Sequence, residues 1–139
     1  MTLRTALIIN FLVCALALAV ICWGQEPETS EADLRRDVAL SIARWHSLTR
    51  QQAILLLAIE EHEKGGPGKE FGIESIPCEF KDGRKSYVVN CIRACEMIKR
   101  RCPVPDKEGV WKLGERWAEH RAWWKYVWRN MRKYKNIIY

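Results

Sequence analysis

The sequence predicts an α+β fold, in which N-terminal helices pack on a small disulfide-bonded antiparallel hairpin or sheet and a long amphipathic helix follows. Three observations predict it: an apolar helical segment at 50–64, a turn signal between strand-forming runs within 70–91, and a 3-4 apolar spacing after residue 110. A mainly α secreted protein is the alternative, because the cysteine-bearing stretch after residue 90 also fits a helix.

Residues 1–24 have the layout of a secretory signal peptide. Arg4 precedes an almost unbroken apolar run at 6–22, and the small residues Cys22 and Gly24 fit the positions before a cleavage site. Cleavage would leave Gln25 as the first residue of a secreted, extracellular chain. An uncleaved signal anchor is the alternative, since 17 apolar residues are marginal for crossing a bilayer.

Residues 25–109 are predicted to form one small domain that begins with two helices. Apolar residues at helical spacing predict the first helix over 32–46. Thr49 and Gln52 have the spacing of a capping box, so a second helix is expected from there to Gly65. Its middle is apolar on every side, which is typical of a helix that other elements surround.

The second half of this domain is predicted to contain a hairpin and two disulfides. Asp82-Gly83 lies between runs rich in Ile, Phe, Tyr and Val, which is a hairpin signal. Four cysteines remain after signal cleavage, and in a small secreted domain they indicate two disulfides with three possible pairings. These cysteines are Cys78, Cys91, Cys95 and Cys102. Their spacing does not match the usual zinc sites.

Residues 110–139 are predicted to form a cationic, tryptophan-rich helix. The segment carries eight basic and two acidic side chains, a net charge of +6 that equals the excess of the whole chain. An apolar stripe at 3-4 spacing runs through Trp117, Trp124, Val127 and Met131, while Trp111, Trp123 and Trp128 fall beside it. The residues predicted to bind a membrane or another anion are Trp111, Lys112, Trp117, Arg121, Trp123, Trp124, Lys125, Trp128, Arg129, Arg132 and Lys133.

Catalytic and metal-binding signals are weak. His46, His62 and His120 each stand alone in their segments, and no phosphate loop or exposed-serine motif is present. The sequence therefore favours a protein that is not an enzyme, with no catalytic, metal-binding or cofactor-binding residues and no small-molecule substrate.

Part of the chain resembles secreted cystatin-like proteins of the cathelicidin and chemerin type. The resemblance covers about residues 47–105 and rests on LTRQQ at 48–52, LAIEEHEK at 57–64, CIRAC at 91–95 and CPVP at 102–105. It implies a cystatin-type sheet and a precursor whose tail is released by proteolysis, with Val110 as the expected cleavage position. The Gln-x-Val-x-Gly segment of inhibitory cystatins is absent, so protease inhibition is not expected.

Two functions are compatible with these features. The first is a host-defence protein whose tail binds and disrupts anionic membranes. The second is a secreted ligand, such as a chemoattractant, a cytokine-like protein or a gamete-recognition protein, whose basic helix binds a receptor or an acidic glycan. Nucleic acid is not expected as the main partner of a secreted chain. The two functions differ in whether the tryptophans face the core of the protein or its surroundings.

Overall fold

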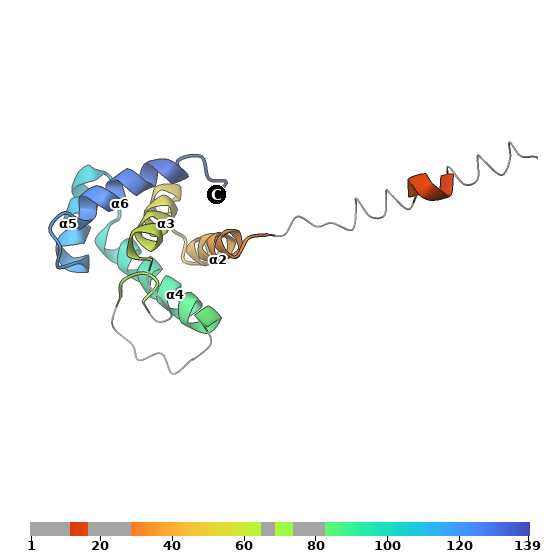
Figure 1. Cartoon of the computed structure of the whole chain (residues 1–139). Helices are drawn as coiled ribbons and strands as arrows, with labels where there is room; N and C mark the ends of the chain where they lie inside the picture. The colour runs from red at the N-terminus through yellow and green to blue at the C-terminus, as the bar shows by residue number, and fades with distance from the viewer. Residues whose placement is uncertain (1–11, 17–28, 65–68, 74–82) are drawn as a thin grey trace, which may run out of the picture. The chain divides into compact units, whose positions relative to one another are not determined.

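Helices are the only regular elements in the parts of the chain that the structure describes. The computed structural model describes residues 12–16, 29–64, 69–73 and 83–139, and no strand occurs within these ranges (Figure 1). The predicted α+β class and the sheet implied by the cystatin resemblance are therefore wrong, whereas the mainly α alternative fits. The helices are α2 (Glu31–Trp45), α3 (Arg50–Glu63), α4 (Gly83–Arg101), α5 (Lys107–Trp117) and α6 (Trp123–Met131), which continues into the 3-10 turn η1 (Arg132–Tyr134).

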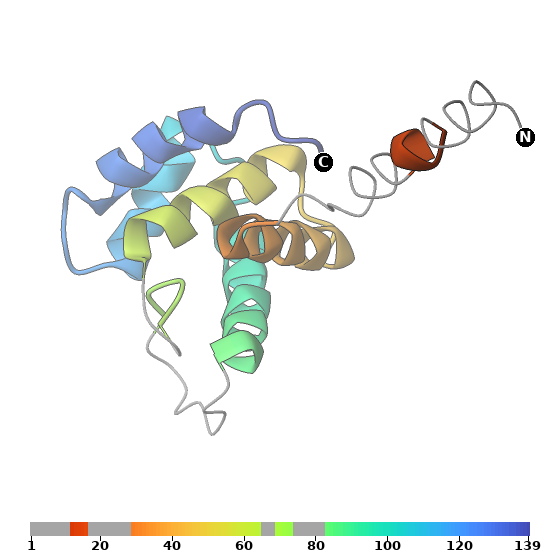
Figure 2. The ribbon, with the colours of Figure 1, turned by 45° about the vertical axis from the view of Figure 1, so that its right-hand side comes forward.

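Helix α3 is the centre of the core, as its sequence predicts. The capping box forms at its start: Thr49 Oγ1 accepts from the Gln52 amide at 3.2 Å, and Gln52 Oε1 accepts from the Thr49 amide at 2.9 Å. The helix ends at Lys64, whose left-handed φ of 41° closes the last turn. Every residue from Gln52 to Ile59 is buried, because α6 and α4 pack against α3 (Figure 2).

Helix α4 replaces the predicted hairpin, at least over the residues that the structure describes. Gly83 begins the helix instead of completing a turn. Five buried residues follow a helical spacing on one face: Tyr87, Cys91, Cys95, Ile98 and Cys102. Val88 and Val89 are only half-buried beside this face, so their preference for strands has little packing to act through. Residues 74–82, which hold the other predicted strand and Cys78, lie outside the described ranges.

The geometry of α4 is incompatible with disulfides among three of the four predicted cysteines. Cys91, Cys95 and Cys102 are free thiols and each is fully buried. Residues four apart on a helix have Cβ atoms about 5–6 Å apart, whereas a disulfide needs about 3.5–4.5 Å. Cys102, whose amide still donates to Ile98 O at 2.8 Å, lies about 10 Å along the axis from Cys95. Two disulfides within the predicted set would therefore require a break in α4.

The predicted single tail helix is two helices, α5 and α6, with a break at 118–122. Ala118 is extended and ends α5. In a straight helix Trp117 and Trp123 would lie about 9 Å apart along the axis and point in different directions. The break lets their rings stack with centroids 6.0 Å apart. Gly114 permits this close approach, because a Cβ there would lie 3.0 Å from Cε3 of Trp123.

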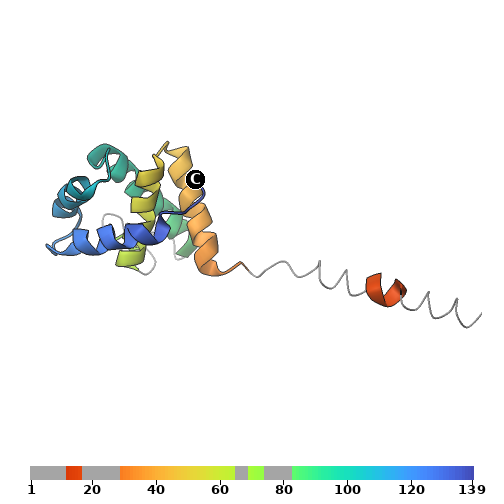
Figure 3. The ribbon, with the colours of Figure 1, turned by 90° about the horizontal axis from the view of Figure 1, so that it is seen from above.

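The last residues of the chain pack where α2 meets α3 (Figure 3). Tyr139 donates its hydroxyl to Leu48 O at 2.8 Å, and Arg44 donates to Ile138 O at 3.2 Å. Arg50 donates to the carbonyls of Lys135 and Ile137. These contacts hold the tail to the beginning of the core helix and its preceding turn.

A short segment at 69–73 connects three helices through its own side chains and backbone. Buried Glu70 accepts from Ser86 Oγ at 2.9 Å and from Asn90 Nδ2 at 2.7 Å, which ties it to α4. Phe71 is fully buried, and its carbonyl accepts from Trp117 Nε1 of α5 at 3.0 Å. Gly72 has a φ of +69° and lies against Glu63 of α3, so a side chain there would clash.

Most of the predicted signal peptide, including Gly24, lies outside the described residues, and so does Gln25, the predicted first residue after cleavage. Residues 12–16 are helical and exposed, and they belong to a unit separate from residues 32–139. Among the described helices, none combines the length and the hydropathy that crossing a membrane requires.

Candidate functional site

The strongest candidate site is the solvent-facing side of α6, which we call the outer face. The opposite side packs inward through Trp123, Val127 and Met131, which are spaced four residues apart. An α-helix with this inward stripe must direct the intervening positions to solvent. The outer face consists of Arg121 in the preceding turn, Lys125, Tyr126, Arg129 and Arg132, with half-buried Trp124 and Trp128 along its edge.

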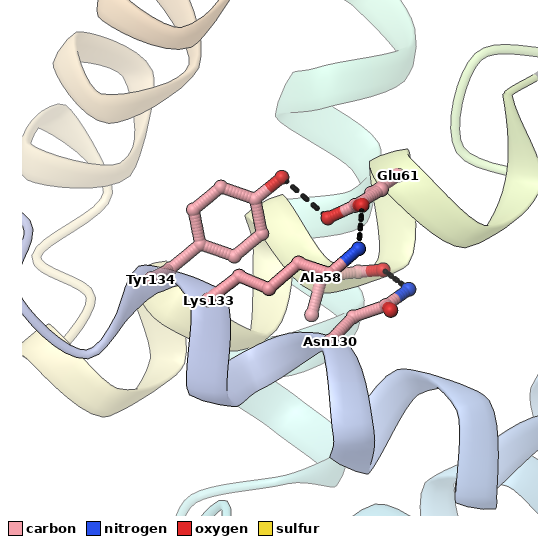
Figure 4. A network of polar contacts seen from close by, with 5 residues as sticks. All are labelled: Ala58, Glu61, Asn130, Lys133 and Tyr134. Atoms are coloured by element: carbon pink, nitrogen blue, oxygen red, sulfur yellow. Dashed lines mark hydrogen bonds and ion pairs between the residues drawn. The ribbon is translucent and has the colours of Figure 1, made fainter.

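The inward side of α6 and η1 is fixed to α3 by polar contacts as well as by packing. Trp123 Nε1 donates to Glu63 Oε1 at 2.6 Å. In η1, the element after α6, Lys133 pairs with Glu61 of α3, and Tyr134 donates its hydroxyl to the same carboxylate at 2.7 Å (Figure 4). Burial would raise the pKa of Glu61, but the hydrogen bonds from Lys133 and Tyr134 lower it below its usual value. A charged Glu61 thus holds the tail in place.

The cations of the outer face have no carboxylate partners among the described residues. Helix α6 itself contains no acidic residue. The acidic side chains that do pair with tail cations lie elsewhere: Glu61 pairs with Lys133, and Glu108 pairs with Lys112 at 2.7 Å. Arg121, Lys125, Arg129 and Arg132 form no ion pair in the part of the chain that the structure describes. The outer face is therefore a ridge of positive charge that no carboxylate of the described segments neutralises.

Aromatic rings position two of these cations, Lys125 and Arg129. Lys125 and Lys107 each place their ammonium about 6 Å from the centre of the Trp124 ring, at 5.9 and 6.0 Å. Arg129 lies over the ring of Tyr126 at 5.8 Å. Tyr126 in turn stacks on His62 of α3, with centroids 5.5 Å apart and planes 11° apart. The ridge is therefore more rigid than a row of free lysine and arginine side chains.

A groove between α5 and α6 adjoins the ridge. Its volume is about 480 Å³, and its lining includes Trp111, Trp124 and Arg121 together with Glu115 and Glu119. Trp111 is 43% exposed and so contributes an accessible ring to this groove. The groove thus places Trp111, one of the predicted anion-binding residues, next to the basic ridge.

The structure separates the predicted site residues into three groups. The first group comes together on or beside the outer face: Trp111, Arg121, Trp124, Lys125, Trp128, Arg129 and Arg132. The second turns inward, since Trp123 is 2% exposed and Trp117 donates to Phe71 O. The third, Lys112 and Lys133, is paired with carboxylates. Trp123 and Trp124 exchange the roles that the stripe assigned to them, since Trp123 is buried and Trp124 is only half-buried, whereas Val127 and Met131 face inward as predicted.

Two residues of this site were missed by the sequence analysis. Lys107 lies in the linker of the sequence pattern but reaches Trp124 at the start of α6. Tyr126 is 46% exposed and supports Arg129. The i, i+3 spacing of Tyr126 and Arg129 was visible in the sequence and could have indicated their contact. Nothing in the sequence placed Lys107 beside Trp124, because that contact crosses the break.

The described residues offer little for catalysis. No cluster of three or more His, Cys, Asp or Glu side chains within them could hold a metal ion. A pocket of about 610 Å³ is lined by His62, His120, Glu63 and Glu119, but His62 is stacked on Tyr126. A hydrogen bond with Cys95 and burial raise the pKa of Cys91, and burial raises the pKa of Cys102 to about 11. These thiols are therefore protonated and poor nucleophiles.

The remaining predicted processing position, Val110, is fully buried inside α5. A protease could reach it only after α5 unfolds locally, because cleavage requires an accessible, extended segment.

Comparison with known proteins adds no relative. No protein-family model matches the chain, no curated protein matches it, and no solved structure matches it.

Proposed function

We propose that this chain is a secreted, non-enzymatic binding protein that presents the outer face of α6 to an acidic partner, of which a sulfated glycan is the best match. One observation carries this proposal. The tail buries the inward side of α6 in its own domain, yet leaves four cations exposed without carboxylate partners among the described residues: Arg121, Lys125, Arg129 and Arg132. Such a surface attracts anions through its charge.

The spacing of the cations supports a linear polyanion. Lys125, Arg129 and Arg132 lie at i, i+4 and i+7, so they follow one side of the helix over about 10 Å. Guanidinium groups bind sulfate and carboxylate groups through paired hydrogen bonds, and two of these three cations are arginines. Lys125 and Arg129 also lie over the rings of Trp124 and Tyr126, which limits the motion of these two side chains. A chain of negative groups would therefore meet several cations at once.

Neutralising the ridge should abolish binding to heparin. The triple variant Arg121→Gln, Lys125→Gln, Arg129→Gln is expected to elute from a heparin column at a much lower salt concentration than the wild type, because three charge contacts are lost. The matched control, Lys64→Gln, Lys69→Gln, Arg101→Gln, removes the same net charge from exposed positions away from the outer face. If the two variants lost heparin retention equally, net charge alone would explain binding, and the outer face would not be a specific binding site.

Membrane disruption by the tail is the second candidate function. It is favoured by the exposed or half-exposed rings of Trp111, Trp124, Tyr126 and Trp128 beside the cations, since this combination suits a lipid interface. Deep insertion would need Trp123, Val127 and Met131 as well, and these residues are buried in the folded domain. The tail would therefore have to leave α3 before it could act.

We expect the isolated peptide 111–139 to become helical on anionic vesicles and to release their contents, whereas the intact protein should not. Release by the peptide alone would support a precursor that is activated by proteolysis. Release by neither would eliminate this second function and leave the binding function untouched. Circular dichroism and dye leakage from the same vesicles give both readings.

A further inference from the structure

A second cationic surface lies at the opposite end of the tail, around Trp45. Trp45 is the last residue of α2 and is 86% exposed, although the neighbouring helix face is buried through Ala39, Leu40 and Ala43. Ile138 is 90% exposed. Arg44 joins the two sites, because it precedes Trp45 and donates to Ile138 O at 3.2 Å. Two large apolar side chains therefore protrude from one region of the molecule.

Cations surround these two side chains. Lys99 of α4 donates to His46 O at 2.8 Å, directly after Trp45. Arg50 donates to the carbonyls of Lys135 and Ile137. We call Trp45, Ile138, Arg44, Arg50, Lys99 and Lys135 the Trp45 corner. Each of its contacts in the described chain is to a backbone carbonyl or an aromatic ring, and none is to a carboxylate.

The adjoining groove has the same charge. It has a volume of about 500 Å³, runs beside His46 and is lined by Arg93, Lys99 and Arg100 with one carboxylate, Glu96. Basic residues at the end of α4 also suit the negative end of that helix, which accounts for their local stability. The preference of basic residues for the end of a helix does not explain why the Trp45 indole beside them is exposed.

We propose that the Trp45 corner is a docking site for the surface of an anionic membrane, separate from the outer face of α6. Trp45 and Ile138 enter the interfacial layer of the lipid, while Arg44, Arg50, Lys99 and Lys135 meet the headgroup phosphates. Tryptophan is enriched at this depth of a bilayer, because its ring is apolar and its N–H still finds an acceptor. Cations at the surface each strengthen attachment to anionic lipid by roughly fivefold.

The shape of the corner distinguishes a lipid surface from a protein partner. Side chains that are 86% and 90% exposed protrude, so a folded partner would need a matching cavity for each of them. A lipid surface is fluid and adapts to protruding groups. A second copy of this chain is disfavoured by charge, since a symmetric contact would bring two sets of unneutralised cations together.

The test uses the full chain and sedimentation with vesicles of phosphatidylcholine alone or with about one third phosphatidylserine. The wild type should bind the anionic vesicles at least tenfold more strongly than the neutral ones, and added salt should weaken this binding. Trp45→Ala should reduce the affinity by about tenfold or more, because one large aromatic side chain no longer leaves water. Ile138→Ser should show a smaller loss in the same direction.

Leu34→Ala is the matched control, since Leu34 is also an exposed apolar residue of α2 but lies near the other end of that helix from Trp45. It should bind within twofold of the wild type. Unchanged binding by Trp45→Ala, or an equal loss in Trp45→Ala and Leu34→Ala, would overturn the proposal. So would a dimer that Trp45→Ala converts to a monomer without any vesicle binding. Thermal melts of each variant establish that the comparison is between folded proteins.

Discussion

Replacing Trp123 by alanine is expected to lower the free energy of unfolding by about 3–5 kcal/mol. Trp123 is 2% exposed, stacks on Trp117 at 6.0 Å and donates its indole N–H to Glu63. The substitution removes a large ring from the contact between α5, α6 and α3, and leaves the Glu63 carboxylate without that donor. A loss of this size is a large part of the total stability of a small domain. Urea denaturation followed by circular dichroism measures it.

Trp111→Ala supplies the comparison for this variant. Because Trp111 is 43% exposed, its removal should change the free energy of unfolding by only a few tenths of a kcal/mol up to about 1 kcal/mol. If Trp123→Ala were equally mild, the tail would not be an integral part of the domain. The release of a membrane-active tail would then cost little, and the second candidate function would gain support over the first.

Replacing Glu70 by alanine should lower the free energy of unfolding by about 2–6 kcal/mol. Ser86 Oγ and Asn90 Nδ2, both buried, donate to the two oxygens of this buried carboxylate. Each donor left unsatisfied costs about 1–3 kcal/mol, so the loss exceeds that of an ordinary surface residue. The same denaturation measurement applies. In Glu70→Ala, the amides in the first half of α4 should also exchange their hydrogens faster than those of α3, because Glu70 no longer links segment 69–73 to that half.

Glu70→Gln tests the origin of this loss. Glutamine keeps the size of the side chain and one acceptor oxygen, so one of the two donors can remain satisfied. We expect the free energy of unfolding of Glu70→Gln to lie between that of the wild type and that of Glu70→Ala. Equal costs for the glutamine and alanine variants would mean that the charge, rather than the number of accepted hydrogen bonds, determines the stability of the segment.

Local signals in the sequence were sufficient for the first two helices of the domain. Thr49 and Gln52 form their capping box within four residues, so no distant contact is needed to define the start of α3. The apolar residues of α2 also predicted a helix, and it runs from Glu31 to Trp45. On this helix Ala39, Leu40 and Ala43 are buried, whereas the apolar residues Leu34 and Trp45 near its two ends are exposed.

Distant contacts explain the two elements that were wrong. The turn signal Asp82-Gly83 and the valines after it favoured a hairpin, but the buried face from Tyr87 to Cys102 packs as a helix and overrides that preference. The break between α5 and α6 depends on Phe71 and Glu63, which accept from Trp117 and Trp123. Neither partner is near the tail in the sequence, so the spacing of apolar residues could not reveal it.

The sequence indicates most of the residues that belong to the candidate site but not which of their side chains face solvent. Charge counting correctly placed the excess cations in residues 110–139. Which of them remain unpaired depends on carboxylates such as Glu61, which lies 72 residues before Lys133. The Trp45 corner was not predicted at all, because Arg44, Lys99 and Lys135 come from three separate parts of the chain.

The covering of α3 by α6 has a consequence for the synthesis of the protein. Glu63 at the end of α3 and Trp123 at the start of α6 are 60 residues apart. At a synthesis rate of about 5–20 residues per second, a helix that is apolar on every side waits roughly 3–12 seconds for its cover. During that interval, Leu55, Leu56 and Ile59 are available to chaperones and to other nascent chains. Slow codons between the two helices should therefore increase aggregation more than the same codons placed after α6.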